Sequence, residues 1–308
     1  MTPSNVLPWL ALVTFGAGWG AMQPANKIAV EGGFEPFGIM VWQGVVTLIL
    51  AGALAARMGR PKGRAQWAIC AQVAVLGTLI PHFASFTAVT HLPAGLVAII
   101  LSTIPIFALL MGLALRREVL TTARAAGLAL GFVAMVLIAT SRGDVGGGAL
   151  WAVAVGLLAP LCYALNSTLL AGRGMAGLHP LQAFAGAAVI FLPVSMIAAM
   201  LTGQIKGIGA DLPSLAVIAT AVGHTVIYTG FLWLIGVAGA VFASQTAYLV
   251  TGFGIVWSMV LLDERYAAGV WIALGLMFLG LTLVRPVRSR LAPDNGARNT
   301  VQGATPRG

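Results

Sequence analysis

The stretch LPAGLVAIILSTIPIFALLMGLALRREVLTTARAAGLALGFVAMVLI, residues 92–138, decides the fold that we expect for this chain. An apolar run leads to the charged corner Arg116–Glu118, and a second apolar run follows it. The stretch AGAVFASQTAYLVTGFGIVWSMVLLDERYAAGVWIALGLMFLGLTLV, residues 238–284, has the same plan, with Glu264 lying 264 − 118 = 146 positions after Glu118. Two hydrophobic spans hinged at a glutamate thus occur twice, and many secondary transporters are built from such internal repeats.

The composition of the chain places it in a lipid bilayer. Hydrophobic residues make up 59% of its 308 positions, charged residues only 8%, and the mean hydropathy is +0.96. A soluble domain carries about a quarter charged residues, so this chain lacks the side chains that a water-facing surface requires. The cysteines Cys70 and Cys162 lie in apolar runs and form no disulfide framework. The net charge of +9 comes from basic residues in short loops and the tail, so we expect no nucleic-acid partner.

Apolar segments of about 20 residues, the length needed to cross the hydrocarbon core, follow one another along the sequence. Short connections rich in Gly, Pro, Asp and Arg separate them. The first segment has no basic leader and no small-residue cleavage site, so we expect it to be retained as a helix. The ten predicted spans are residues 7–28, 36–57, 66–89, 93–115, 122–141, 148–171, 180–202, 213–236, 239–262 and 266–286.

The sequence therefore predicts an all-α membrane protein with ten transmembrane helices arranged as two inverted five-helix repeats. Residues 1–145 form the first repeat, residues 146–287 form the second, and residues 288–308 form a polar, disordered cytoplasmic tail. Because five is an odd number, the second repeat enters the membrane in the opposite orientation. Exchanging the conformations of two inverted halves converts an outward-open cavity into an inward-open one, which gives alternating access.

The distribution of basic residues predicts the orientation. Lys and Arg gather in cytoplasmic loops of membrane proteins. With the N-terminus in the cytoplasm, all but four of the 17 basic residues lie on the inner side. We therefore expect a multi-pass protein of the cytoplasmic (inner) membrane with both termini in the cytoplasm. The four basic residues left on the outer side are Lys27, Arg142, Lys206 and Arg265.

Several of these features together resemble the drug/metabolite transporter superfamily, EamA type. They are the ten spans in two halves, Trp19-Gly20 with Lys27 near the end of the first span, and Pro105 with Glu118 bridging the fourth and fifth spans. The resemblance covers about residues 7–287. Thr251 departs from it, because Thr251 stands where the first half has Pro105, and this leaves a kink in the ninth span open. The resemblance implies a carrier of small metabolites, commonly an exporter of amino acids or similar polar solutes, with a cavity between the halves.

Polar side chains inside the spans are candidates for function, because in lipid each of them needs a partner. No Asp, Glu, Lys or Arg lies deep in a predicted span. His224 lies near the middle of the eighth span, with Thr220 and Tyr228 four residues to either side on the same face. His82 lies in the third span. Both histidines are candidates for solute contact and for proton relay, and the alternative is a neutral histidine that bonds to a neighbouring helix.

Further polar and aromatic residues fall at equivalent places in the two halves. Trp19 and Gln23 lie beside Pro24 in the first span, and Tyr163 and Asn166 follow Pro160 in the sixth. A proline frees backbone carbonyls and an aromatic ring offers a surface to apolar or cationic solutes, which suits a cavity wall. The alternative is contact between helices. The predicted cavity-lining residues are Trp19, Gln23, His82, Ser102, Tyr163, Asn166, His224, Tyr228, Gln245 and Tyr248.

Charged residues near the membrane surfaces favour structural roles. Glu118 and Glu264 lie at helix starts, where a carboxylate caps backbone N–H groups and suits the helix dipole. Lys27 is expected either to extend towards the outer headgroups or to bind a carboxylate at the cavity mouth. The pairs Gly16/Gly20 and Gly127/Gly131 have the spacing that lets helices approach closely, and they do not decide between a monomer and a homodimer.

We therefore expect a secondary transporter, and no enzyme, that moves a small neutral or zwitterionic solute such as an amino acid by alternating access, with export as the expected direction. A multiply charged phosphate ester would require Arg or Lys near the membrane centre. The sequence holds no P-loop, no intramembrane His-Glu zinc motif and no buried Asp, so no cofactor, metal or catalytic residue is predicted. A passive channel, a structural membrane protein and an intramembrane enzyme with a Ser/His dyad are the alternatives.

Overall fold

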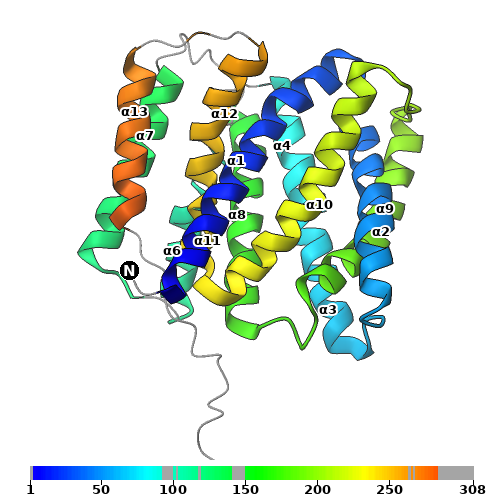
Figure 1. Ribbon diagram of the computed structural model, residues 1–308, viewed down its shortest axis with the longest axis horizontal. Coiled ribbons are helices and arrows are strands. Elements are labelled where there is room, and N and C mark those ends of the chain that lie inside the picture. The colour runs from blue at the N-terminus through cyan, green and yellow to red at the C-terminus, as the bar shows by residue number, and fades with distance from the viewer. Residues whose placement is uncertain are drawn as a thin grey trace, which may run out of the picture.

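The computed structural model describes residues 3–91, 100–101, 103–116, 119–140, 150–262, 265 and 268–283. All regular secondary structure in this part of the chain is helical, as the all-α class predicts, and the helices stand side by side in one bundle (Figure 1). The elements are α1 (Pro3–Glu31), α2 (Pro36–Ala56), α3 (Gly63–Ala74), the π-helical turn η1 (Val75–Leu79), α4 (Ile80–His91), α6 (Ile104–Ala114), α7 (Thr122–Thr140), α8 (Leu150–Arg173), α9 (Pro180–Thr202), α10 (Leu212–Ala238), α11 (Ala240–Ser244), α12 (Thr246–Leu262) and α13 (Ala268–Leu283).

Six helical stretches of the described chain are long and apolar enough to cross a membrane. Each of the ten predicted spans contains helix within the described residues, and three of them are represented by shorter apolar helices, Ile104–Ala114, Thr122–Ala134 and Trp271–Gly280. The six long stretches are Pro36–Ala56, Gly63–Ser85, Trp151–Arg173, Pro180–Thr202, Leu212–Ala238 and Ala240–Leu261.

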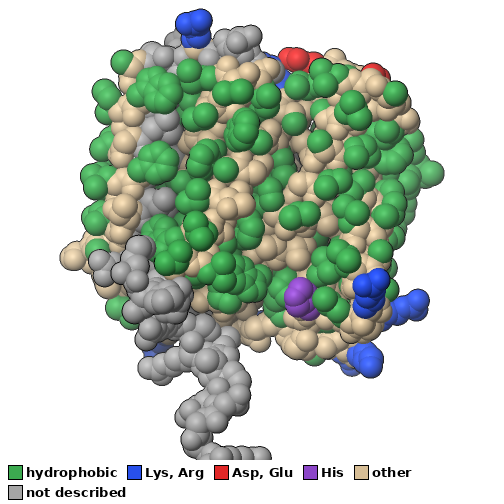
Figure 2. Space-filling view, viewed as in Figure 1, with side chains coloured by type: hydrophobic (Ala, Val, Ile, Leu, Met, Phe, Trp, Pro, Cys, Tyr) green, Lys and Arg blue, Asp and Glu red, His purple; other side chains and the backbone are tan. Residues whose placement is uncertain are grey.

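The surface of the bundle has the pattern of a protein that sits in a bilayer. Figure 2 shows hydrophobic side chains over the broad face of the helices, whereas the Asp, Glu, Lys and Arg side chains in view gather at the two ends. Apolar residues such as Leu10, Leu54 and Ile197 are exposed on the helix sides. In water these faces would need a covering partner, and in a membrane the lipid tails cover them.

Helices of the first half pack mainly against helices of the second half. α1 contacts α10 and α12, α8 contacts α4 and α6, α2 contacts α9 and α10, and α3 contacts α9. α7 and α13 pack against each other at one edge of the bundle (Figure 1). The interior of the bundle is therefore built jointly by residues that are far apart in the sequence.

The helices α2 and α9 run antiparallel and are hydrogen-bonded at both ends. At the start of α2, the backbone N–H of Phe37 donates to Gln204 Oε1, just after the end of α9, at 2.9 Å. At the start of α9, Gln182 Nε2 donates to the carbonyl oxygens of Met58 and Gly59, just after the end of α2, at 3.0 and 2.8 Å. These contacts fix the register of the two helices along their whole length.

Glycines permit two close helix crossings. A Cβ atom added at Gly280 of α13 would lie 2.6 Å from the carbonyl oxygen of Gly127 and 3.2 Å from the backbone nitrogen of Gly131 on α7. A Cβ atom added at Gly20 of α1 would lie 2.8 Å from the backbone nitrogen of Gly254 on α12. The glycine pairs of the sequence therefore face neighbouring helices of the same chain.

The ninth predicted span is divided by a break. α11 ends at Ser244 and α12 begins at Thr246, so the break falls at Gln245. The backbone N–H of Gln245 donates to the carbonyl of Phe242 at 3.1 Å, which closes α11 with a tighter turn. The interruption thus precedes Thr251, which lies inside α12 and donates its hydroxyl to the carbonyl of Ala247.

Gly280→Ala is expected to lower the melting temperature, because the new methyl group meets backbone atoms of α7. Overpacking typically costs about 1–3 kcal/mol, which exceeds the roughly 1 kcal/mol that alanine gains over glycine inside a helix. Fluorescence-detected melting of the purified protein measures the change. Gly275→Ala on the same helix is the control, since nothing lies within 4 Å of its added Cβ. If both variants melt at the same temperature, the predicted α7–α13 packing is wrong.

The carboxyl of Asp211 should stabilise the protein in a pH-dependent way. Hydrogen bonds from Ser214, whose backbone N–H donates to Asp211 Oδ1 at 2.9 Å, lower the pKa of this carboxyl at the start of α10. A group whose pKa is lowered by folding stabilises the protein above its unfolded pKa, and this contribution is lost as the pH falls through the folded pKa. The melting-temperature difference between the wild type and Asp211→Ala should therefore shrink between neutral pH and about pH 3.

Asp211→Asn is the matched control for this titration, because the amide keeps an accepting oxygen at the helix start but carries no charge. The difference between Asp211→Asn and Asp211→Ala should be independent of pH. If the melting-temperature difference between the wild type and Asp211→Ala stays constant over the same pH range, the result would contradict the lowered pKa of Asp211.

Candidate functional site

Polar and aromatic side chains from five helices meet in the interior of the bundle. Two of these side chains, on α1 and α4, come from the first half of the chain, and the others come from the second half. We call this group the central cluster. It consists of Trp19 on α1, His82 on α4, Asn166 on α8, Phe184 on α9, and His224 and Tyr228 on α10.

Rings surround His224 on several sides. The imidazole is stacked on the Tyr228 ring, with centroids 5.3 Å apart and an interplanar angle of 17°. The ring centroid of His82 lies 5.6 Å away and that of Phe184 lies 5.8 Å away. Helical spacing explains the stack, because residues four apart lie one above the other on one face. The result is a buried imidazole in an aromatic environment.

A hydrogen bond between Trp19 and His224 links the two halves at this point. The indole Nε1–H of Trp19 donates to His224 Nδ1 at a long 3.5 Å. An imidazole nitrogen that accepts a hydrogen bond carries no proton, so the neutral ring holds its proton on Nε2. Within the described residues, the buried Nε2 has no hydrogen-bond partner. The cluster therefore presents one N–H donor that is available to a ligand.

A second polar chain crosses three helices next to His224. Gln72 Nε2 on α3 donates to Asn166 Oδ1 at 3.1 Å and to the Asn166 carbonyl at 3.3 Å. Asn166 Nδ2 in turn donates to the Tyr228 hydroxyl oxygen at 3.2 Å. Both amides thus find partners without water, which fixes the position of the Tyr228 ring and hence of the imidazole stacked on it.

Gly77 provides the space that the Tyr228 hydroxyl occupies. A Cβ atom at Gly77 would lie only 1.9 Å from that oxygen. Gly77 lies inside η1, where the backbone N–H of Ile80 donates to the carbonyl of Val75 in a π-helical turn. Pro81 explains this turn, because it has no N–H and its ring would collide with the carbonyl four residues earlier in a regular helix. The proline therefore widens the helix where Tyr228 packs against it.

The other predicted lining residues lie in different places. Tyr163 lies three residues before Asn166 on α8. The Tyr248 ring packs against Gly131 and its hydroxyl donates to the carbonyl of Leu128 at 3.3 Å, so Tyr248 belongs to the α7–α12 contact rather than to the central cluster.

Gln245 is also separate from the cluster. Its Nε2 donates to the carbonyl of Val241 on its own chain segment at 3.2 Å, and its buried Oε1 has no partner among the described residues. Ser102, the Gln23 side chain and the glutamates Glu118 and Glu264 lie outside the described residues. Lys27 is exposed.

Sequence reasoning missed three residues that build the site. Gln72 carried a usable signal, because an amide inside an apolar span requires a partner. Gly77 was marked by Pro81 four residues later. Phe184 had no such mark, since a phenylalanine in an apolar run packs equally well anywhere in a core. Among the described residues, no group of three or more His, Cys, Asp or Glu is placed to hold a metal ion.

Loop contacts close the bundle at both ends. At the end where α2 begins, Trp42 Nε1 donates to the carbonyl of Lys206 at 2.9 Å, and the Lys206 ammonium donates to the carbonyl of Gly32. At the other end, Gln66 Nε2 donates to the carbonyl of Ala176 at 3.0 Å, beside the contacts of Gln182. Both sets join the first half of the chain to the second.

Gly77→Ala should displace Tyr228 and lower the melting temperature, and Tyr228→Phe should relieve part of this loss because the hydroxyl is then absent. In a double-mutant cycle, two residues in contact typically show a coupling of about 0.5–3 kcal/mol. Gly236→Ala on α10, where nothing lies within 4 Å of the added Cβ, is the control. Additive effects of Gly77→Ala and Tyr228→Phe would show that the two residues do not touch.

Comparison with known proteins finds a family match over most of the first half of the chain and a similar fold over most of its length. Residues 7–140 match the model of the EamA-like transporter family. Comparison with curated proteins gives no match.

Among solved structures, 29 chains match. One of them, described only as "Crystal structure of protein", has a TM-score of 0.75 and 16% identity, with 90% of this chain and 97% of that chain covered. At this identity the likeness concerns the fold alone. The match over residues 7–140, together with apolar helices long enough to cross a membrane, supports a multi-pass membrane transporter of the drug/metabolite transporter type.

Proposed function

We propose that this protein is a secondary transporter of a small polar metabolite and that the solute binds at the central cluster. The observation that carries the proposal is the unpaired His224 Nε2, buried in the interior of a membrane transporter and surrounded by rings from both halves. A buried N–H group without a partner is costly in an apolar environment. A solute oxygen that accepts from it removes this cost, so His224 favours a solute with a carbonyl or carboxylate group.

The composition of the central cluster favours a neutral or zwitterionic solute with an apolar part, such as an amino acid. The cluster supplies aromatic rings, one amide and imidazoles, and none of its members is Asp, Glu, Lys or Arg. A solute with net charge would enter this apolar interior without a compensating charge, which is unfavourable. Export from the cytoplasm is the direction that we propose.

Helix packing supports two inverted repeats of five helices, residues 1–145 and 146–287. Each pair of helices that packs across the two halves has a counterpart when the halves are exchanged: α1 with α10 and α12 corresponds to α8 with α4 and α6, and α2 with α10 corresponds to α9 with α3. The second helices of the two halves, α2 and α9, pack antiparallel, as an inversion requires. Alternating access would then open the contacts of Lys206 and of Gln182 in turn.

We further propose ten spans in the cytoplasmic membrane with both termini in the cytoplasm. The connection between α2 and α3 carries Arg57, Arg60 and Lys62, and Arg64 follows in the first turn of α3. The positive-inside rule assigns this end to the cytoplasm. The N-terminal end of α1 lies at the same end of the bundle (Figure 1).

Proton coupling through His224 and His82 is the remaining option within this function. Protonation of His224 Nδ1 requires loss of the hydrogen bond from Trp19, because a protonated imidazole has two donors and no acceptor. A proton at this position would therefore loosen the contact between α1 and α10. This gives a physical route by which a proton and a conformational change are linked, whereas facilitated diffusion needs no such step.

The test is a thermal-shift screen of the purified protein with amino acids, amines, organic acids and nucleosides, followed by counterflow of the best ligand in liposomes. A ligand at 100 times its dissociation constant stabilises the folded state by about 2.7 kcal/mol. His224→Ala should weaken binding at least tenfold, roughly the value of one hydrogen bond to a charged group. Tyr228→Phe, which removes the hydroxyl bonded to Asn166, should weaken binding roughly two- to tenfold.

Val226→Ala is the matched control, because Val226 lies between these residues on α10 but is 63% exposed on the outer face of the bundle. It should bind and transport like the wild type. Saturable counterflow at wild-type rates in both His224→Ala and Tyr228→Phe would exclude the central cluster as the solute site. Flux without saturation or counterflow would favour a passive channel.

A further inference from the structure

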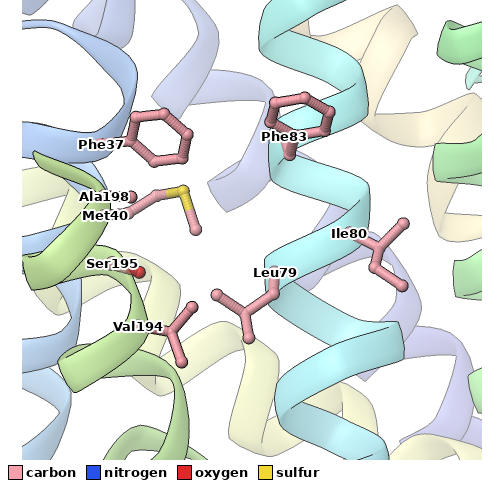
Figure 3. Close-up of a pocket in the computed structure, with 8 residues that line it drawn as sticks. All are labelled: Phe37, Met40, Leu79, Ile80, Phe83, Val194, Ser195 and Ala198. Carbon is pink, nitrogen blue, oxygen red and sulfur yellow. The ribbon is translucent and has the colours of Figure 1, made fainter. Parts of the chain in front are cut away.

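A cavity lies between α2, the η1–α4 segment and α9. Its volume is about 240 Å³. Figure 3 shows Phe37 and Met40 on one side, Leu79 and Phe83 opposite them, and Val194 and Ser195 on α9. Ser195 supplies the hydroxyl of an otherwise apolar wall. The cavity is separate from the central cluster, since the two share no residue.

The cavity borders the lipid-facing surface of the bundle. Phe83 is 51% exposed and Val194 is 48% exposed, and both belong to helical stretches long and apolar enough to cross the membrane. The Phe37 and Phe83 rings stack across the gap between α2 and α4, with centroids 6.4 Å apart and an interplanar angle of 19°. A molecule dissolved in the bilayer therefore reaches this cavity from the side, next to the stacked rings.

The Ser195 hydroxyl is the feature that calls for a ligand. Ser195 is only 1% exposed, and its Oγ has no hydrogen-bond partner among the described residues. Figure 3 shows the side chain directed from α9 into the space in front of Leu79. A hydroxyl in an apolar environment is costly unless it is bonded. Water does not meet this need, because a buried water requires two to four polar partners and the remaining lining residues offer apolar side chains.

We propose that this cavity binds an uncharged, membrane-dissolved molecule with an apolar body and a single hydrogen-bonding group that pairs with Ser195. The volume fits this class, since a cavity of about 150 Å³ already holds benzene and this one is larger. Medium-chain alcohols and alkylated phenols have the required chemistry. The site lies at the lipid-facing side of the bundle. Binding there does not depend on which solute the central cluster transports.

The depth of Ser195 distinguishes this ligand from a phospholipid tail. Ser195 lies seven residues before Thr202, where α9 ends, which is about 10 Å along the helix axis. The ester groups of a phospholipid stay near the membrane surface, so only its hydrocarbon chain would reach this depth. A hydrocarbon chain would fill the cavity but leave the Ser195 hydroxyl unbonded. The hydroxyl therefore favours a small amphiphile over a lipid tail.

Leu79 connects the cavity to the rest of the molecule. It lines the cavity from η1, and it also packs against the core that contains Phe184, Phe191 and Tyr228. The same π-helical turn holds Gly77 against the Tyr228 hydroxyl. A bound amphiphile thus contacts the element on which the position of Tyr228 depends.

The experiment is photolabelling in liposomes with an eight-carbon alcohol that carries a diazirine group, followed by peptide mapping with mass spectrometry. Labelling should concentrate on Met40 and Phe83 and exceed the labelling of Ile197, which is 58% exposed on the outer face of α9. Octanol should compete at roughly two- to tenfold lower mole fraction in the lipid than octane, because only the alcohol bonds to Ser195. In Ser195→Ala the two competitors should become equal.

Ala198→Phe, which places a ring in the cavity wall, should abolish labelling of Met40 while that of Ile197 remains. The melting temperatures of both variants show whether they are folded. If Ala198→Phe does not fold, the competition experiment with Ser195→Ala alone tests the proposal. Labelling of Met40 no stronger than that of Ile197 would overturn the proposal. Equal competition by octane and octanol in the wild type would also overturn it and would identify the occupant as a hydrocarbon chain.

Discussion

A polar side chain inside the hydrocarbon core of a membrane has no water to bind, so leaving it without a partner is costly. In this chain the constraint is met by the path from Gln72 through Asn166 to the Tyr228 hydroxyl. Three helices from both halves of the sequence are joined by it. If one of these groups were unpaired, a cost of about 1–3 kcal/mol would remain in the interior. The arrangement of α3, α8 and α10 around this path, and with it the position of the imidazole of His224, follows from that requirement.

The same path explains why a local irregularity occurs at η1. Pro81 cannot continue a regular helix, and the π-helical turn before it moves the backbone of Gly77 beside Tyr228. Such turns are frequent at functional sites because they redirect side chains without ending the helix. Here the turn contacts two regions: Gly77 packs against Tyr228 of the central cluster, and Leu79 lines the cavity between α2, α4 and α9.

The central cluster lies between two sets of loop contacts, those of Lys206 at one end and those of Gln66 and Gln182 at the other. Both sets join the first half of the chain to the second, so neither end opens unless the halves move relative to each other. The unpaired Nε2 of His224 lies among rings that contact one another closely. This arrangement is consistent with the alternating access that we propose.

The sequence by itself determined that this chain is a bundle of apolar helices in a membrane, because hydropathy and segment length depend only on composition along the chain. It also predicted a set of cavity-lining residues, since polar residues inside spans need partners. Those that meet in the central cluster are Trp19, His82, Asn166, His224 and Tyr228. Only the tertiary structure decided that these residues meet, that Phe184 joins them, and that Tyr248 packs instead against Gly131 on α7. Helical periodicity shows which residues share a face, but the helix that this face contacts depends on packing between segments that are distant in sequence.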